Sequence, residues 1–296
     1  MLNIKYITDS ASDIPKDLAE KYDVAVLATP ITFEDGTTKR DWYDMTPAEF
    51  YDLLEKSTEI PTTSQPPVFE IEETFRKYLD SHDAIIYVSL SSFSSGTYNA
   101  ANMAKNNILE DRPDAKIEII DSRAFSLFEV FMLEEAIKLQ NEGKSLEEIV
   151  EGVKMRRRMT DVCVVVDTLK YLEKGGRINK ASLVVGTLLD LKPVLSVRGG
   201  TMESIDKFRG SKSVYSKMVK KVKTMDVDLS DPRFSIVESN VPERAEALKE
   251  ALKEGFENYQ FNYHSSIGGT VGTHIGPGTL AVFFKTNTPQ KVYDED

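Results

Sequence analysis

Short apolar runs rich in isoleucine and valine recur along this chain, and each is bounded by turn or cap residues. Runs of this length and composition predict β-strands. They occupy residues 4–8, 24–31, 84–89, 116–121, 162–167, 234–238 and 279–284.

Helical patterns lie between many of these runs. Ser145 and Glu148 have the spacing of a capping box, and apolar residues follow them at helical intervals. A second helix is predicted to begin at Thr46-Pro47, because proline is favoured in the first turn and an apolar stripe follows. Strands that alternate with helices predict an α/β protein.

The length of 296 residues favours two domains. No internal repeat or linker of low complexity marks a border. We place the border near Met159-Thr160, which gives an N-terminal α/β domain at residues 1–160 and a C-terminal α/β domain at residues 161–296. Gly199-Gly200 is read as a hairpin turn inside the second domain.

The charge balance argues against nucleic acid as a partner. The chain has 37 Lys+Arg and 48 Asp+Glu, a net charge of −11, and its pI is near 5.0. Such a protein repels polyanions, so a DNA-associated regulatory role is disfavoured. The basic clusters at residues 154–158 and 217–223 are read as solvated helix faces.

Several features favour a soluble cytoplasmic protein. The N-terminus meets a charge within its first residues and has no signal-peptide pattern, and no apolar run approaches the roughly 20 residues that span a bilayer. The single cysteine, Cys163, lies in an apolar run that reads as a buried strand, so we expect neither a disulfide nor a nucleophile there. The scarcity of histidine and cysteine argues against a soft-metal site.

Small polar residues gather where predicted strands end. Asp9, Asp121 and Asp167 each follow an apolar run, and they either cap the next helix or face a ligand at the carboxyl edge of a sheet. The loops at residues 61–66 and 91–98 carry more hydroxyl groups than capping requires. The second loop leads into a predicted helix whose N-terminus can receive an anion.

A histidine between glycines near the C-terminus is the strongest candidate for ligand binding. His274 stands in the run Gly272 to Gly278, where glycine allows close backbone approach and imidazole can donate a hydrogen bond. The standard phosphate-loop, dinucleotide, hydrolase-elbow and zinc-protease signatures are absent from the sequence. A triad of Ser95, His274 and a strand-end aspartate remains an alternative, because spacing alone does not establish contact.

Five motifs follow one another along nearly the whole chain. They are Ile7-Thr-Asp-Ser-Ala-Ser-Asp-Ile-Pro15, Pro61-Thr-Thr-Ser-Gln-Pro66, Ser95-Gly-Thr-Tyr98, Asp167-Thr-Leu-Lys-Tyr-Leu-Glu-Lys-Gly-Gly-Arg-Ile178 and Gly272-Thr-His-Ile-Gly-Pro-Gly278. In sequence and order they resemble the motifs of the DegV family of bacterial fatty-acid-binding proteins. The resemblance implies two α/β domains, the first with a mainly parallel sheet and the second with a mixed sheet. It also implies an internal tunnel for a long-chain fatty acid and no cofactor.

The resemblance assigns the ligand carboxylate to Thr63, Ser95 and His274, with Thr62 and Ser64 as second choices. It further implies presentation of the acid to an ATP-dependent fatty-acid kinase, with Arg177 or Arg209 available to dock that partner. We therefore expect a non-catalytic carrier. The alternative from another class is a hydrolase or transferase that uses Ser95 and His274 on an acyl ester or phosphate.

The sequence departs from the family in one helix. Bulky Phe128, Val130 and Phe131 stand where the family has small residues. We expect them either to narrow the tunnel or to act as ordinary packing residues.

Overall fold

The computed structural model of the protein describes residues 2–178, 191–210 and 213–291. Its contacts divide the chain into two units. Unit 1 comprises Met1–Thr46 and Ser57–Arg157, and unit 2 comprises Pro47–Lys56 and Arg158–Asp296. The chain therefore leaves unit 1 at Thr46, forms one helix of unit 2, and returns at Ser57. The two units are described separately below.

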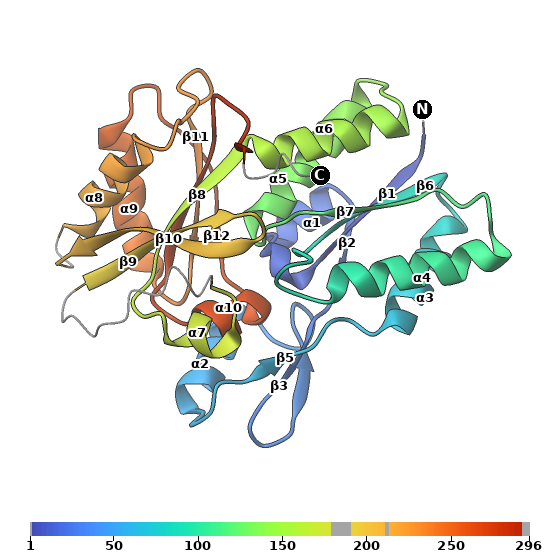
Figure 1. The fold of residues 1–296 in the computed structure, drawn as a ribbon, viewed down its shortest axis with the longest axis horizontal. Helices are drawn as coiled ribbons and strands as arrows, with labels where there is room; N and C mark the ends of the chain where they lie inside the picture. The colour runs from blue at the N-terminus through green and yellow to red at the C-terminus, as the bar shows by residue number, and fades with distance from the viewer. Residues whose placement is uncertain (1, 179–190, 211–212, 292–296) are drawn as a thin grey trace. The chain divides into compact units, whose positions relative to one another are not determined.

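Unit 1 is built on a parallel sheet in the order β2-β1-β6-β7 (Figure 1). Every residue of β1 and β6 is buried, as expected for central strands of a parallel sheet covered on both faces. This is why β6 reads as a nearly continuous apolar run. The strands are β1 (Ile4–Asp9), β2 (Val24–Leu27), β6 (Ala84–Ser89) and β7 (Ile117–Asp121).

Helices cover both faces of this sheet. Ile7 and Tyr87 pack with α3 and α4, whereas Tyr6 and Thr8 bond to residues of α5. Successive strand residues point to opposite faces, so α5 lies on the face opposite α3 and α4. The helices of unit 1 are η1 (Ser10–Ser12), α1 (Lys16–Lys21), α3 (Val68–Leu79), α4 (Thr97–Asp111), α5 (Leu127–Asn141) and α6 (Leu146–Arg158).

One local prediction for unit 1 is confirmed and one is modified. Ser145 and Glu148 form a reciprocal capping box, because each backbone amide donates to the other's side chain. The apolar run at residues 24–31 is two strands, since β2 ends at Leu27 and β3 begins at Pro30. The second strand belongs to a small antiparallel sheet, in the order β4-β3-β5, of β3 (Pro30–Thr32), β4 (Thr38–Arg40) and β5 (Thr62–Thr63).

Unit 2 contains a mixed sheet in the order β10-β9-β8-β13-β11-β12. Only the β11–β12 pair is parallel among its described pairings. Gly199 and Gly200 form the predicted hairpin turn between β9 and β10, with φ of 56° and 92°. The strands are β8 (Thr160–Val165), β9 (Leu191–Arg198), β10 (Thr201–Arg209), β11 (Arg233–Glu238), β12 (Gln260–Ser266) and β13 (Leu280–Lys285).

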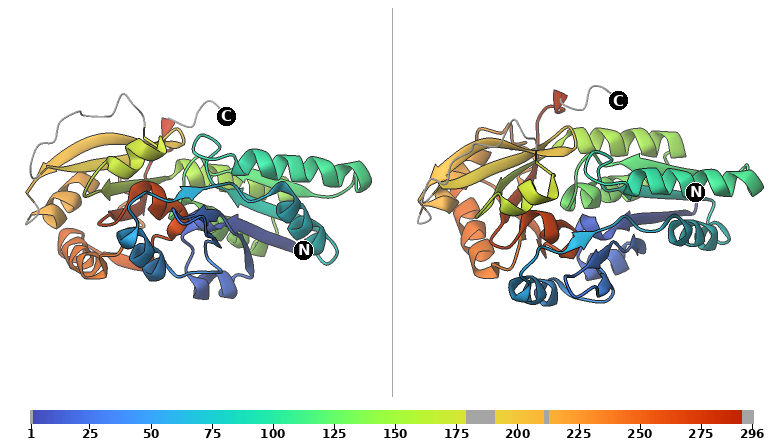
Figure 2. Two further views of the ribbon diagram at one scale, coloured as in Figure 1. Left: turned by 90° about the horizontal axis from the view of Figure 1, so that it is seen from below. Right: turned by 60° about the horizontal axis from the view of Figure 1, so that its bottom comes forward.

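The core of unit 2 forms where α8 and α9 pack together over one face of the sheet (Figure 2). Cys163 is fully buried there, as its apolar run predicts, and burial raises the pKa of its thiol to about 12. The helices of unit 2 are α2 (Pro47–Lys56), α7 (Lys170–Gly175), α8 (Val214–Val222), α9 (Pro242–Gly255) and α10 (Gly269–Ile275).

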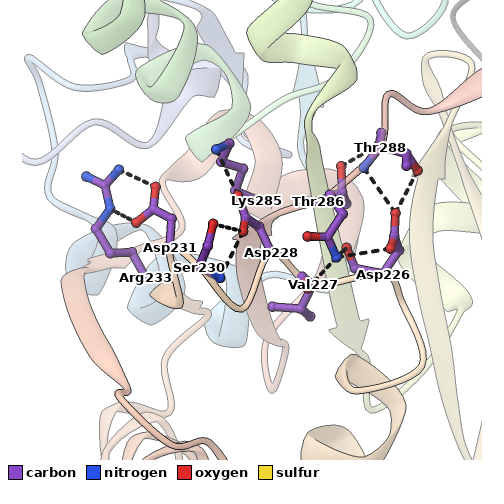
Figure 3. Close-up of polar contacts among 10 residues, drawn as sticks. Asp226, Val227, Asp228, Ser230, Asp231, Arg233, Lys285, Thr286 and Thr288 are labelled. Carbon is purple, nitrogen blue, oxygen red and sulfur yellow. Dashed lines mark hydrogen bonds and ion pairs between the residues drawn. The ribbon is translucent and has the colours of Figure 1, made fainter.

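Polar contacts fix the connection between α8 and β11 to the end of β13 (Figure 3). Asp226 accepts bonds from the amide and hydroxyl of Thr288 at 3.1 and 2.7 Å. Asp228 accepts bonds from the Ser230 hydroxyl and from Lys285. The carboxylates therefore hold this loop to the strand that follows the His274 segment.

The predicted fold class is confirmed, with a parallel N-terminal sheet and a mixed C-terminal sheet. Within the described ranges, no helix is both long and apolar enough to cross a bilayer.

Candidate ligand-binding site

In unit 1 the threonines of the 61–66 loop are held by strand pairing. Thr63 and Thr62 lie opposite Ile31 and Thr32 of β3, and the Ser64 amide donates to the Pro30 carbonyl at 3.1 Å. Thr63 is half-buried, whereas Thr62 and Ser64 are exposed. Neighbouring residues of a strand face opposite ways, so Thr63 and Thr62 present their hydroxyls in different directions.

Ser95 stands immediately before α4. Its hydroxyl accepts a bond from the Thr97 amide at 3.2 Å and shares a 2.8 Å bond with the Thr97 hydroxyl. The first turn of α4 has no acidic residue, so its partial positive charge is not neutralised locally. The helix predicted from Ser95-Gly96-Thr97 is confirmed.

The two hydroxyl loops of unit 1 touch each other. A Cβ atom at Gly96 would lie 1.8 Å from Oε1 of Gln65, so the Gln65 side chain rests on the Gly96 backbone. Gln65 is two residues from Thr63, and Gly96 directly follows Ser95. The structure thus brings together the neighbourhoods of the two hydroxyls selected from the sequence.

The strand-end aspartates of unit 1 have structural roles. Asp9 caps η1 through the Ala11 amide and also accepts bonds from the Tyr87 hydroxyl and the Leu90 amide. Burial raises its pKa to about 6 despite these donors. Asp121 accepts a 2.6 Å bond from the Ser92 hydroxyl and so joins two loops.

Glu129 is a buried carboxyl that the sequence analysis did not single out. It is fully buried on α5, and the Thr8 hydroxyl donates to its Oε2 at 2.8 Å. Burial, and then the nearby Asp9 carboxyl, raise the pKa of Glu129 well above its usual value. The available signal was one acidic residue inside an apolar helical segment.

The bulky residues that depart from the family pattern are packed in unit 1. Phe128, Val130 and Phe131 are buried in α5, and the Arg156 guanidinium lies 5.2 Å from the Phe131 ring centre. Ordinary packing therefore accounts for their burial. Their effect on a ligand tunnel stays a prediction.

In unit 2 the glycines around His274 allow close packing on neighbouring helices. A Cβ at Gly272 would lie 2.7 Å from the Phe50 ring and from the Tyr51 hydroxyl, both on α2. Gly276, with φ of 76°, has its backbone against the Tyr171 ring, where a Cβ would lie 2.2 Å from Cδ2. The α10 segment is therefore held between α2 and α7.

Ser239 fixes the end of the His274 segment and was missed at the level of sequence. Its hydroxyl donates to the Gly276 carbonyl at 2.8 Å and accepts from the Thr279 amide at 2.7 Å, and its carbonyl accepts from the Gly278 amide. Ser239 is fully buried. These bonds give the loop after His274 a defined shape.

The His274 imidazole is neutral at ordinary pH. Burial, with a smaller contribution from the positive charge of Arg177, lowers its pKa to about 4. The sequence alone does not determine the charge of this residue. A neutral ring offers one donor and one acceptor nitrogen.

The remaining candidates of unit 2 are polar but have different surroundings. Arg177 is half-buried, whereas Arg209 is exposed at the end of β10. Asp167 pairs with Lys192 at 3.0 Å and with Arg244 at 3.2 Å. Asp167 is therefore held by two cations rather than acting as a helix cap.

Of the residues in the alternative catalytic triad, Ser95 belongs to unit 1 and His274 belongs to unit 2. Because the Ser95 hydroxyl bonds to Thr97 within its own turn, the contacts within unit 1 explain its position without a catalytic base.

Comparison with known proteins identifies the family. Residues 3–287 match the model described as "Uncharacterised protein, DegV family". The chain belongs to the DegV family. A DegV domain-containing protein of Caldanaerobacter subterraneus subsp. tengcongensis is 34% identical over 285 residues, which cover 96% of this chain and 99% of that relative.

Solved DegV structures share the whole fold. One from Thermus thermophilus, described as showing fatty acid binding of a DegV family protein, is 29% identical with a TM-score of 0.86, covering 96% of this chain and 100% of the other. Another, from Ruminococcus gnavus and described with vaccenic acid, is 26% identical with a TM-score of 0.86 and the same coverage.

Proposed function

We propose that this DegV family protein binds a long-chain fatty acid in an internal tunnel, with the carboxylate held by Thr63, Ser95 and His274. Thr62 and Ser64 are secondary candidates. The observation that carries the proposal is the contact between the two hydroxyl loops of unit 1, in a fold shared with DegV proteins described as fatty-acid-binding. The neutral His274 supplies the donor from unit 2.

The chemistry of these groups suits a carboxylate on an apolar tail. Hydroxyls and a neutral imidazole donate hydrogen bonds without requiring a buried cation. About a dozen buried methylenes contribute roughly 10 kcal/mol, whereas each hydrogen bond to a charged group contributes about 1.5–3 kcal/mol. The tail therefore provides most of the affinity, and the hydroxyls provide orientation and selectivity.

The proposal extends to a protein partner. A bound acid is chemically inert until its carboxylate is activated, and an ATP-dependent fatty-acid kinase would convert it to an acyl phosphate. Arg177 and Arg209 are candidate docking residues for that partner, since guanidinium groups pair well with carboxylates and phosphates. In this role the protein is a carrier and performs no chemistry alone.

Native mass spectrometry of the purified protein, followed by extraction of any lipid, tests the proposal. We expect one fatty acid per chain. The Thr63→Ala/Ser95→Ala double variant should lose most of this occupancy while keeping its fold, because each change removes a donor rather than core volume. Thr38→Ala is the matched control, since Thr38 is an exposed threonine of the same small sheet and has no proposed ligand role.

Two outcomes would count against these assignments. Wild-type occupancy in the double variant would exclude Thr63 and Ser95 as the main head-group ligands. A protein that is isolated empty and refuses added vaccenic acid would overturn the carrier function. In that case a covalent adduct on Ser95, or hydrolysis of an acyl ester without a partner, would establish the hydrolase alternative.

A further inference from the structure

The turn that follows α7 has a fixed backbone. α7 ends at Gly175, and Gly176 is its left-handed cap with φ of 70°. The Gly176 amide donates to the Glu173 carbonyl, and the Arg177 amide donates to the Leu172 carbonyl, both at 3.1 Å. These bonds are typical of a glycine-terminated helix. They set where the backbone of Gly175 and the side chain of Arg177 lie.

The Gly175 backbone lies directly against the His274 ring. A Cβ at Gly175 would lie 2.5 Å from Nδ1 of His274 and 3.4 Å from its Cγ. Carbon and nitrogen atoms that are not bonded do not approach to 2.5 Å, so any side chain at this position would displace the imidazole. Gly175 is helical and has no positive φ, so its absent side chain is explained by this contact rather than by backbone conformation.

The Arg177 side chain also contacts the Gly175 backbone. Its Nη1 donates a hydrogen bond to the Gly175 carbonyl. The guanidinium is thereby held near the buried ring, and its positive charge disfavours a second positive charge on His274. An arginine cannot relieve this effect by deprotonation, because its guanidinium stays protonated in proteins.

Other charged groups near α10 lie on α7, on α2 and on the strand end beside Gly278. The charged residues of the two helices are exposed, and Asp167 is paired with Lys192 and Arg244. Among these groups, Arg177 is the one whose charge lowers the pKa of His274. The helix residues are Lys170, Glu173 and Lys174 on α7, and Glu49, Asp52, Glu55 and Lys56 on α2.

We propose that Gly175 and Arg177 are positioning residues for His274. Gly175 provides the flat surface on which the imidazole lies, and Arg177 keeps the ring in its neutral form. One ring nitrogen then donates to a ligand oxygen without first taking up a proton. The inference rests on the proposed function for its binding consequence, which is constant affinity for the carboxylate between about pH 5 and pH 8.

The proposed effect of the Arg177 charge on His274 is tested on lipid-free protein by following the His274 ring signals with NMR during a pH titration. Arg177→Gln should raise the titration midpoint measurably above that of the wild type. Lys174→Gln is the matched control, because Lys174 has the same charge in the same turn but is exposed. An unchanged midpoint in Arg177→Gln, or an equal shift in Lys174→Gln, would overturn the role of Arg177.

The geometric half is tested with Gly175→Ala and Gly176→Ala. Alanine at Gly175 should move the His274 ring signals and weaken vaccenic acid binding at least tenfold. Alanine at Gly176 meets open space but has an unfavourable φ, so it should lower stability while leaving the ring signals and affinity unchanged. Wild-type His274 signals in Gly175→Ala would overturn the proposal.

The two sets of readouts separate this inference from the proposed function. If the wild-type protein does not bind vaccenic acid, the carrier function fails, whereas the His274 signals in the lipid-free variants still decide whether Gly175 and Arg177 position the ring.

Discussion

Buried carboxyl groups have opposite surroundings in the two units. In unit 1, Asp9 and Glu129 accept hydrogen bonds from neutral hydroxyls and amides. In unit 2, Asp161 is bonded to Arg198 and Asp228 to Lys285. Burial raises the pKa of Asp9 to about 6, whereas bonds from Ser230 and Lys285 lower the pKa of Asp228 to about 2 (Figure 3).

The charge composition of the units follows the same division. Unit 1 contains 27 acidic and 16 basic residues, whereas unit 2 contains 21 of each, so the whole net charge of −11 comes from unit 1. An excess of acidic residues favours the neutral form of any further carboxyl that is buried among them. Unit 2 has no such excess, and its buried Asp161 and Asp228 are each paired with a cation.

The stability of the two units therefore depends on different electrostatic contacts. A carboxyl kept neutral by burial needs no cation, and it destabilises the fold only when it ionises. A buried ion pair is stable only while both partners remain, because removal of one leaves an unpaired buried charge. Substitutions should therefore affect the two units differently.

The largest effect is expected from breaking the buried pair in unit 2. Arg198→Met leaves the Asp161 carboxylate, which is only 4% exposed, without its cation. We expect unit 2 to lose about 3–5 kcal/mol of stability in urea unfolding. The Arg198→Met/Asp161→Asn double variant should recover part of that loss. A loss below about 1 kcal/mol in the single variant would show that the Asp161–Arg198 pair contributes little to the stability of unit 2.

The central strands could be predicted from sequence because they are apolar on both faces. The run at residues 84–89 corresponds fully to β6, whose residues are all buried. β12 was not predicted, because it lies at the edge of its sheet and its residues are polar or only partly buried. Periodicity reports which face of an element is buried, and an edge strand has no fully buried face.

It could not be predicted that α2 belongs to unit 2, and here the reason is different. The apolar stripe that contains Phe50 correctly predicts a helix after Thr46. An apolar stripe does not show which element packs against it, and here that element is α10 of unit 2. The chain order alone places this helix between two segments of unit 1.

The same limit applies to the candidate site. Ser95 could be selected because its role depends on the next two residues. Ser239 and Glu129 could not, since Ser239 bonds to Gly276 and Glu129 to Thr8, both far away in the sequence. Local patterns carry no information about such contacts.

A pH titration should change the two units in opposite directions over nearly the same range. The pKa of Asp9 is raised from 3.8 to about 6, so native unit 1 holds an extra proton in this window and loses stability as the pH rises through it. The pKa of His274 is lowered from 6.5 to about 4, so unit 2 loses stability as the pH falls through that window. Each effect amounts to about 3 kcal/mol.

Hydrogen exchange measured separately on peptides from β1 and β13 would follow the two units. Asp9→Asn should remove the pH trend assigned to it in unit 1 and leave unit 2 unchanged, and His274→Gln should do the reverse. If the stability of both units changed in the same direction with pH, and neither variant altered that change, Asp9 and His274 would not be the groups responsible.

The smallest expected effect comes from replacing one buried glutamate in each unit by glutamine. Glu129→Gln should change the stability of unit 1 by less than about 1 kcal/mol, or increase it, because the native side chain is kept neutral by burial and still accepts the Thr8 bond as an amide.

Glu238→Gln should cost unit 2 about 2 kcal/mol. Burial opposes ionisation of Glu238, yet His264, the Ser266 hydroxyl and the Val241 amide together hold its pKa below the usual value. The last two donate to its oxygens at 2.6 Å, and both of these charge-assisted bonds weaken when the carboxylate becomes an amide. Urea unfolding at pH 7 compares the two variants directly. A larger loss for Glu129→Gln than for Glu238→Gln would mean that Glu129 is ionised in the folded protein, and the distinction between the units would then rest on the ion pairs of unit 2 alone.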